Sequence, residues 1–106
     1  MAKKQPFALI YDPEVQGQLD AIEAKYHSLI RLTIDEQLRF EPETVTRNRK
    51  PLERSIELGA RWELRLGPGN RFRVFYRIDA EQQFRILAIG VKERNRVFIA
   101  GKEVKL

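Results

Sequence analysis

At 106 residues the chain has the length of one ordinary domain, and we expect residues 1–106 to form a single folding unit. Hydrophobic residues make up 42% and charged residues 33%, a balance typical of a globular protein and not of a disordered one. The absence of cysteine excludes disulfides, thiolate metal sites and cysteine nucleophiles. Residues 1–14 contain only a short apolar run, too short for a signal peptide or a membrane span, so we expect a cytoplasmic protein that makes no membrane contact.

The net charge of +5 is divided unevenly along the chain. Residues 1–46 contain five basic and eight acidic side chains, whereas residues 47–106 contain fifteen basic and seven acidic ones. This asymmetry predicts that the C-terminal half meets a polyanion, either nucleic acid or an acidic protein segment. A well-solvated surface without such a partner explains the same excess of charge.

The N-terminal part predicts a strand followed by helices. Residues 7–11 form a short apolar run that ends at Asp12-Pro13, which is typical of a buried strand followed by a helix that Asp12 caps. Apolar side chains then recur at helical spacing over residues 15–40, so one face of a long helix or a helical hairpin is apolar. For a hairpin, we expect the break at His27-Ser28 and the end of the helical region at Pro42.

The C-terminal part predicts strands. Residues 43–59 show no period and carry a basic run at positions 47–50, which indicates an irregular connection. Residues 61–66 and 71–78 alternate apolar with mostly charged side chains, which predicts two half-buried strands joined by a turn at 67–70. After a second turn at 79–83, residues 84–91 are almost continuously apolar, as expected of a central strand, and residues 97–99 and 103–106 add a short edge.

This order of elements predicts an α+β fold, with an N-terminal strand and a helical hairpin packed on an antiparallel β-sheet of about four strands. The pleat of the sheet sends alternate side chains to opposite faces. The face toward the helices should receive Trp62, Leu64, Leu66, Phe72, Val74, Tyr76 and Ile78. The opposite face should receive Arg61, Glu63, Arg65, Arg71, Arg73, Phe75 and Arg77.

Five arginines and one aromatic ring on a single face predict a surface that binds RNA or another polyanion. Guanidinium groups match phosphate oxygens in a bidentate manner, and an exposed Phe75 offers a stacking platform for an unpaired base. The alternative is ordinary strand design, in which alternating charges prevent aggregation of sheets and a loop or the C-terminal tail covers Phe75.

Familiar catalytic constellations are missing from the sequence. His27 is the only histidine and lies in the helical region, and the acidic residues lack the spacing of a metal cage, so we expect neither a metal nor another cofactor. Trp62 falls on the core face and is expected to anchor the core. Catalysis, if present, must rely on arginines that bind a phosphate and offset its charge while an internal 2′-hydroxyl attacks.

Two segments, WELRLGPGNRFRVFYRID (residues 62–79) and ILAIGVKERNRVFI (residues 86–99), resemble the C-terminal signature of the RelE/ParE toxin superfamily. The leading strand, the amphipathic helices and the segment NRKPL (residues 48–52) are also similar to that family, so the resemblance covers nearly the whole chain. It implies a RelE-like fold and a toxin that a cognate antitoxin holds inactive. We expect that antitoxin to have an acidic, partly disordered segment.

The resemblance also implies an activity. RelE-type members cut mRNA in the ribosomal A site, so the partners would be the ribosome and mRNA, and ParE-type members poison DNA gyrase. Arg65 and Arg73 match basic residues of the RNase members, and Lys92 falls where a functional arginine is usual. The first hypothesis is therefore a ribosome-dependent mRNA endonuclease with Arg65, Arg73 and Lys92 as catalytic cations. The residues expected to bind RNA or another anion are Arg61, Arg71, Phe75, Arg77, Arg94 and Arg96.

Two positions depart from the RNase pattern. Glu63 falls where a lysine often stands, and its carboxylate would repel the scissile phosphate. Phe98 falls where a tyrosine is expected, and a phenyl ring cannot donate or accept a proton. These departures favour the alternatives: a ParE-like inhibitor of DNA gyrase, or a catalytically weakened homologue that acts only as a binding module.

Overall fold

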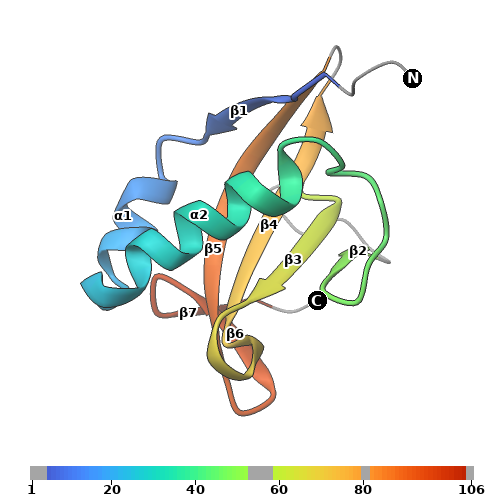
Figure 1. Cartoon of the computed structure of the whole chain (residues 1–106). Helices are drawn as coiled ribbons and strands as arrows, with labels where there is room; N and C mark the ends of the chain where they lie inside the picture. Colours follow the sequence, from blue (N-terminus) through green and yellow to red (C-terminus); the bar gives the residue numbers. More distant parts are fainter. Residues whose placement is uncertain (1–4, 53–58, 80–81, 105–106) are drawn as a thin grey trace.

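The computed structural model describes residues 5–52, 59–79 and 82–104. The N-terminal part of the chain forms one strand and two helices, and the remainder forms strands (Figure 1). The elements in chain order are β1 (Ala8–Tyr11), α1 (Val15–Asp20), the 3-10 turn η1 (Ala24–Tyr26), α2 (His27–Leu38), β2 (Arg49–Pro51), β3 (Trp62–Leu66), the 3-10 turn η2 (Pro68–Asn70), β4 (Phe72–Asp79), β5 (Gln83–Glu93), β6 (Arg96–Ile99) and β7 (Lys102–Val104). The predicted α+β fold, with helices packed on a sheet, is confirmed.

The sheet is larger than predicted. The described residues form seven strands in place of about four, with the order β2-β3-β4-β5-β6-β7 and with β1 paired to β5. All pairs along this order are antiparallel, whereas β1 runs parallel to the first part of β5. Strand β2 lies in the connection that was expected to be irregular, and β6 and β7 are separate strands of the predicted short edge. Strands of three or four residues are too short to show a period of two, which explains the undercount.

The helical region begins and breaks slightly away from the predicted positions. Helix α1 starts at Val15, and Asp12 caps the preceding turn through its Oδ1, which accepts a hydrogen bond of 3.2 Å from the amide of Glu14. The break lies at η1, before the predicted site at His27-Ser28. Nε2 of His27 lies 2.7 Å from the carbonyl oxygen of Ile22, which ties the first turn of α2 to the segment between α1 and η1. The single histidine therefore has a structural contact.

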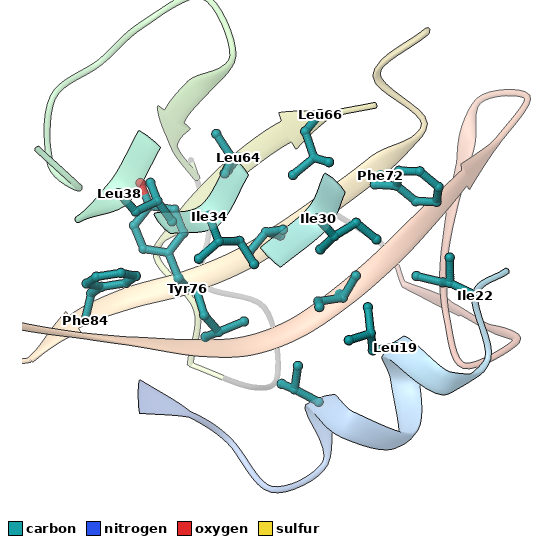
Figure 2. Packing of buried hydrophobic residues seen from close by; sticks show 14 of the residues in the cluster. Leu19, Ile22, Ile30, Ile34, Leu38, Leu64, Leu66, Phe72, Tyr76 and Phe84 are labelled. Atoms are coloured by element: carbon teal, nitrogen blue, oxygen red, sulfur yellow. The ribbon is translucent and has the colours of Figure 1, made fainter. Parts of the chain in front are cut away.

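The main core lies between the helices and one face of the sheet, which we call the helix face (Figure 2). The stripe Ile30, Ile34 and Leu38 of α2 is fully buried there. From the sheet, the predicted residues Leu64, Leu66, Phe72, Val74 and Tyr76 all join this core, and Trp62 and Ile78 pack against it partly buried. The prediction of which side chains point to the helix face is therefore confirmed.

Tyr76 is the hub of this core. Its ring is fully buried and stacks on Trp62 with centroids 6.1 Å apart, so the predicted anchoring role of Trp62 is confirmed. The Tyr76 hydroxyl donates a hydrogen bond of 2.5 Å to the carbonyl oxygen of Pro42. Strand β4 is thereby joined to the segment that follows α2.

Two buried polar side chains fix the helices to the sheet. Oε1 of Gln18 accepts a hydrogen bond of 2.9 Å from the amide of Ile89, on the edge of β5 between the parts paired with β1 and β6. Arg49 donates hydrogen bonds to the carbonyl oxygens of Gln37 and Glu41 at the C-terminal end of α2, where a cation complements the helix dipole. One residue of the predicted basic run is therefore a buried structural contact. None of the helices in the described parts of the chain is long and apolar enough to cross a membrane.

Candidate functional site

Three charged residues of β3 and β4 form a cluster on the face of the sheet opposite the helices. Arg65 lies directly across from Arg73 in the register of these strands, and Glu63 lies two residues before Arg65. A single carboxylate oxygen of Glu63, Oε1, accepts hydrogen bonds from Nε of Arg65 at 2.8 Å and from Nη1 of Arg73 at 2.6 Å. We call Glu63, Arg65 and Arg73 the arginine clamp.

The clamp is largely inaccessible to solvent. The exposed fraction of the side chain is 2% for Glu63, 6% for Arg73 and 32% for Arg65. Nε of Arg73 also donates a hydrogen bond of 3.2 Å to the carbonyl oxygen of Asn70, so Arg73 ties the β3–β4 turn to the sheet. Arg65 and Arg73 share one face as predicted. Glu63 engages both guanidinium groups and Arg73 is buried, so neither is a free cation in the structure, and their role as catalytic cations stays a prediction.

Phe75 is fully buried, so its expected exposure as a stacking platform is wrong. It belongs to a second hydrophobic cluster on the opposite face, with Ala60, Leu87, Ala88 and Val97. Opposite Phe75, strand β5 carries an extra residue, because Phe75 pairs with Ala88 and the next residue of β4 already pairs with Ile86. This bulge and strand β6 bring apolar side chains over the ring. The alternative had a loop or the C-terminal tail cover Phe75. The ring is covered as that alternative expected, but mainly by Leu87 and Ala88 of β5 and Val97 of β6.

Arg71 lies on the helix face, and the prediction that it shares the opposite face is wrong. It precedes the first residue of β4, outside the regular pleat. Its guanidinium lies over the rings of Tyr26 and Phe72, at 6.0 and 5.6 Å from their centroids. It also approaches the carboxylate of Glu23 at 3.9 Å.

Arg77 lies at the opposite end of β4 from the clamp. Its Nε donates a hydrogen bond of 2.8 Å to Asp79, which Arg85 approaches at 3.4 Å. Partial desolvation raises the pKa of the Asp79 carboxyl, but hydrogen bonds from Arg77, Gln83 and Arg85 and the Arg77 charge outweigh it, so the pKa lies below its ordinary value. Arg61 is exposed just before β3, at the same end of the sheet.

The remaining predicted cations lie on the β5–β6 hairpin. Lys92 is half-buried and pairs with Val97, whereas Arg94 and Arg96 are exposed at and after the turn. The amide of Lys92 donates a hydrogen bond of 2.7 Å to the carbonyl oxygen of Arg71, which places this hairpin beside the β3–β4 turn. Apart from Arg71 on the helix face and the buried Phe75, the structure groups the predicted site residues into three places: the clamp, the Asp79 end of β4, and the β5–β6 hairpin.

A groove of about 450 Å³ opens on the helix face between α1–η1 and the β5–β6 hairpin. Its lining is mixed, with Phe98 among the apolar residues and Arg71 among the charged ones. The full lining is Gln18, Ala21, Ile22, Glu23, Tyr26, Arg71, Phe72, Ile89, Val91, Glu93, Phe98, Ala100 and Gly101. Neither Gln18 nor this groove is predictable from local sequence patterns, because α1 and β6 are more than seventy residues apart in the chain.

In the described residues, an N-terminal strand and two helices packed on a largely antiparallel sheet form a RelE-like α+β fold. Residues 9–96 match the family described as the ParE toxin of the type II toxin-antitoxin system, parDE, and the chain belongs to this family. It is therefore the toxin of a type II toxin-antitoxin pair, and its partner is a cognate antitoxin.

Among solved structures, the chain is similar to one in the toxin-antitoxin complex RelBE2 from Mycobacterium tuberculosis. The two chains are 25% identical, the TM-score is 0.65, and the similarity covers 82% of this chain and 99% of the other. A comparison with curated proteins found no match.

Proposed function

We propose that this toxin acts by binding DNA gyrase and not by cutting mRNA. The observation that carries the proposal is the arginine clamp, in which Glu63 engages both Arg65 and Arg73. The resemblance to the RNase members assigns these two arginines to the RNA phosphate. In this chain a phosphate has to displace a carboxylate that is already buried between them.

Displacement of Glu63 is energetically costly. Removing one partner of a buried ion pair typically costs about 3–5 kcal/mol, because the other charge stays desolvated and uncompensated. Glu63 and Arg73 meet this condition, since only 2% and 6% of their side chains are exposed. An entering phosphate would also face the negative charge of Glu63. The cost of displacing Glu63 and the repulsion by its charge both oppose phosphate binding, but neither affects binding to a protein surface elsewhere on the toxin.

Proton transfer is a second difficulty for the RNase mechanism. Attack by a 2′-hydroxyl requires a group that takes its proton, and the position expected to hold a tyrosine holds Phe98. His27 contacts Ile22 on the helix side, away from the clamp. A gyrase inhibitor needs no proton transfer of its own, because its effect follows from binding.

Gyrase inhibition is tested with purified components. Toxin added to gyrase and relaxed plasmid should reduce supercoiling and increase the amount of cleaved DNA held by the enzyme. Toxin premixed with its antitoxin is the matched control and should leave supercoiling at its normal rate. Supercoiling that is unchanged at toxin concentrations well above that of gyrase contradicts the proposal.

The second candidate is a ribosome-dependent mRNA endonuclease. It is favoured by Arg65, whose side chain is one-third exposed. It is also favoured by half-buried Lys92, which lies on β5 two residues after Gly90, the cross-strand partner of Arg73. Induction without antitoxin should then produce cuts in translated messages. Glu63→Gln should increase the cutting, because a neutral amide holds both arginines more weakly and does not repel the phosphate. Intact messages during growth arrest contradict this candidate. Harmless expression of the folded protein contradicts both candidates and favours a binding module.

We also propose that an acidic, partly disordered segment of the antitoxin covers the basic residues of the C-terminal half. The excess of fifteen basic over seven acidic residues in positions 47–106 supports this complementarity. Coexpression with the neighbouring reading frame should give a complex that copurifies and weakens as salt is raised. Repeated failure of the two proteins to copurify contradicts the pairing.

A further inference from the structure

The β5–β6 hairpin carries cations on both faces and at its tip. Val97 belongs to the cluster on the opposite face of the sheet, and its cross-strand partner Lys92 therefore lies on that face. Arg96 is the next residue before Val97 in β6, so its side chain is directed to the helix face. Arg94 occupies the turn itself, with a φ of 57°. Lys92, Arg94 and Arg96 are called the hairpin cations below.

The tip of the hairpin keeps a net positive charge although acidic residues lie near it. Glu93 is exposed between the hairpin cations, and Glu103 approaches Arg96 at 3.8 Å. The Arg96 and Glu103 side chains are 68% and 37% exposed, so their pair is weak and is screened by salt. The adjoining β3–β4 turn adds Arg71, whose side chain is 41% exposed. Figure 1 shows the two turns side by side at the end of the sheet away from β1.

We propose that the hairpin cations bind the phosphate backbone of double-stranded DNA. Strand β7 pairs with β6 only from Val97 onward and β4 pairs with β5 only up to Val91, so residues 92–96 form the narrow tip of the hairpin. The major groove of B-DNA, about 12 Å wide, admits such a two-stranded tip, and its cations on both faces can reach the phosphates on both walls. Contacts of this kind position a protein on DNA without reading its sequence. The proposed site is therefore a non-specific anchor for duplex DNA.

Burial of Phe75 favours the duplex over a single strand. Binding of unpaired bases typically uses exposed aromatic rings as stacking platforms. Phe75, on the face of the sheet opposite the helices, is fully buried. Phe98 lines the groove on the helix face. On the face opposite the helices, the hairpin therefore offers positive charge without the exposed ring of Phe75. Such a surface suits the backbone of double-stranded DNA, whose bases stay stacked inside the duplex.

This inference goes beyond the proposed function, because the toxin alone binds DNA without gyrase. In a gyrase–DNA complex the same hairpin adds a contact with DNA to the contact with the protein. The toxin then has a higher affinity for gyrase on DNA than for free gyrase, since two linked contacts reinforce each other.

The test is fluorescence anisotropy of a short labelled duplex titrated with the full-length toxin at several salt concentrations. Each neutralised phosphate contributes about 0.9 to the slope of log affinity against log salt, so three contacts predict about a fortyfold loss of affinity between about 50 and about 200 mM salt. The double variant R94Q/R96Q should bind roughly tenfold more weakly or worse at low salt, with a slope lower by about two.

The matched control is R47Q/K50Q, which removes the same charge from two exposed residues at the β2 edge of the sheet. It should retain nearly all of the affinity, and both double variants should unfold at the wild-type temperature because all four side chains are exposed. Three results would each overturn the inference: no salt-dependent binding of duplex by the wild type, equal weakening by the control, or tighter binding of single-stranded RNA of the same sequence. Gyrase that is unaffected while DNA binding persists rejects only the proposed function.

Discussion

Nη1 of Arg73 lies 2.6 Å from Oε1 of Glu63, in a pair that the sheet almost completely buries. Loss of one partner leaves the other as an isolated charge in a desolvated place. We expect Arg73→Leu or Glu63→Leu to lower the free energy of unfolding by about 3–5 kcal/mol each. The double variant E63L/R73L should recover much of this loss, because two apolar side chains replace the pair.

Urea denaturation of the two single variants and the double variant gives the coupling energy of this pair. The exposed pair Arg96–Glu103 is the control, and R96Q/E103Q should change stability by less than about 1 kcal/mol. Additive effects of the two clamp substitutions would mean that Glu63 and Arg73 do not interact as described.

Gln18 should be important for stability although it lies on a short helix of mixed composition. Gln18→Leu removes the acceptor for the buried amide of Ile89, and an unsatisfied buried donor costs about 1–3 kcal/mol. Gln16→Leu, on the same helix, removes only exposed hydrogen bonds with Asp20 and Arg31 and should change stability by less than about 1 kcal/mol. Thermal denaturation distinguishes the two, and an equal response of both variants contradicts a specific role for the Gln18–Ile89 bond.

Phe75 should behave as a core residue. Because the ring is fully buried against Ala88 and Val97, Phe75→Ala should destabilise the protein by about 3–5 kcal/mol through lost contacts and a cavity. Phe40→Ala, at a position where half of the side chain is exposed, should cost much less. A Phe75→Ala protein of wild-type stability that has lost a nucleic-acid contact would support an exposed ring.

Tyr76 should make stability depend on alkaline pH. Burial raises the pKa of its hydroxyl above the ordinary value of 10.0, although the Arg49 charge lowers it in part. The unfolded chain releases this proton near pH 10.0 while the folded chain retains it, so stability is fully present below that pH and falls as the pH rises above it.

Tyr76→Phe tests this linkage and removes the hydrogen bond to Pro42. The variant should be about 1 kcal/mol less stable at neutral pH, and its stability should fall less steeply between about pH 10 and pH 11. A residual fall in stability is expected from Tyr11, because burial also raises the pKa of its hydroxyl. Identical alkaline slopes for the wild type and the variant would contradict a buried, protonated Tyr76.

Much of the architecture follows from periodicity along the chain. The helical spacing of Ile30, Ile34 and Leu38 and the alternation through Val74 and Tyr76 predicted the two surfaces that meet in the core. Positive φ at Gly67 and Gly69 agrees with the predicted turn between β3 and β4. These features are local, because a residue's side in a helix or strand depends on its near neighbours in sequence.

Exposure on the face of the sheet opposite the helices could not be predicted from local patterns. Alternation along a strand is enough to predict that Arg65, Arg73 and Phe75 share the side of the sheet away from the helices. Which of these side chains solvent reaches depends on how the strands and loops pack together. Cross-strand pairing brought Glu63 onto Arg73, and a bulge in β5 together with β6 buried Phe75. Exposure depends on segments that are distant in sequence, and a pattern within one strand carries no information about them.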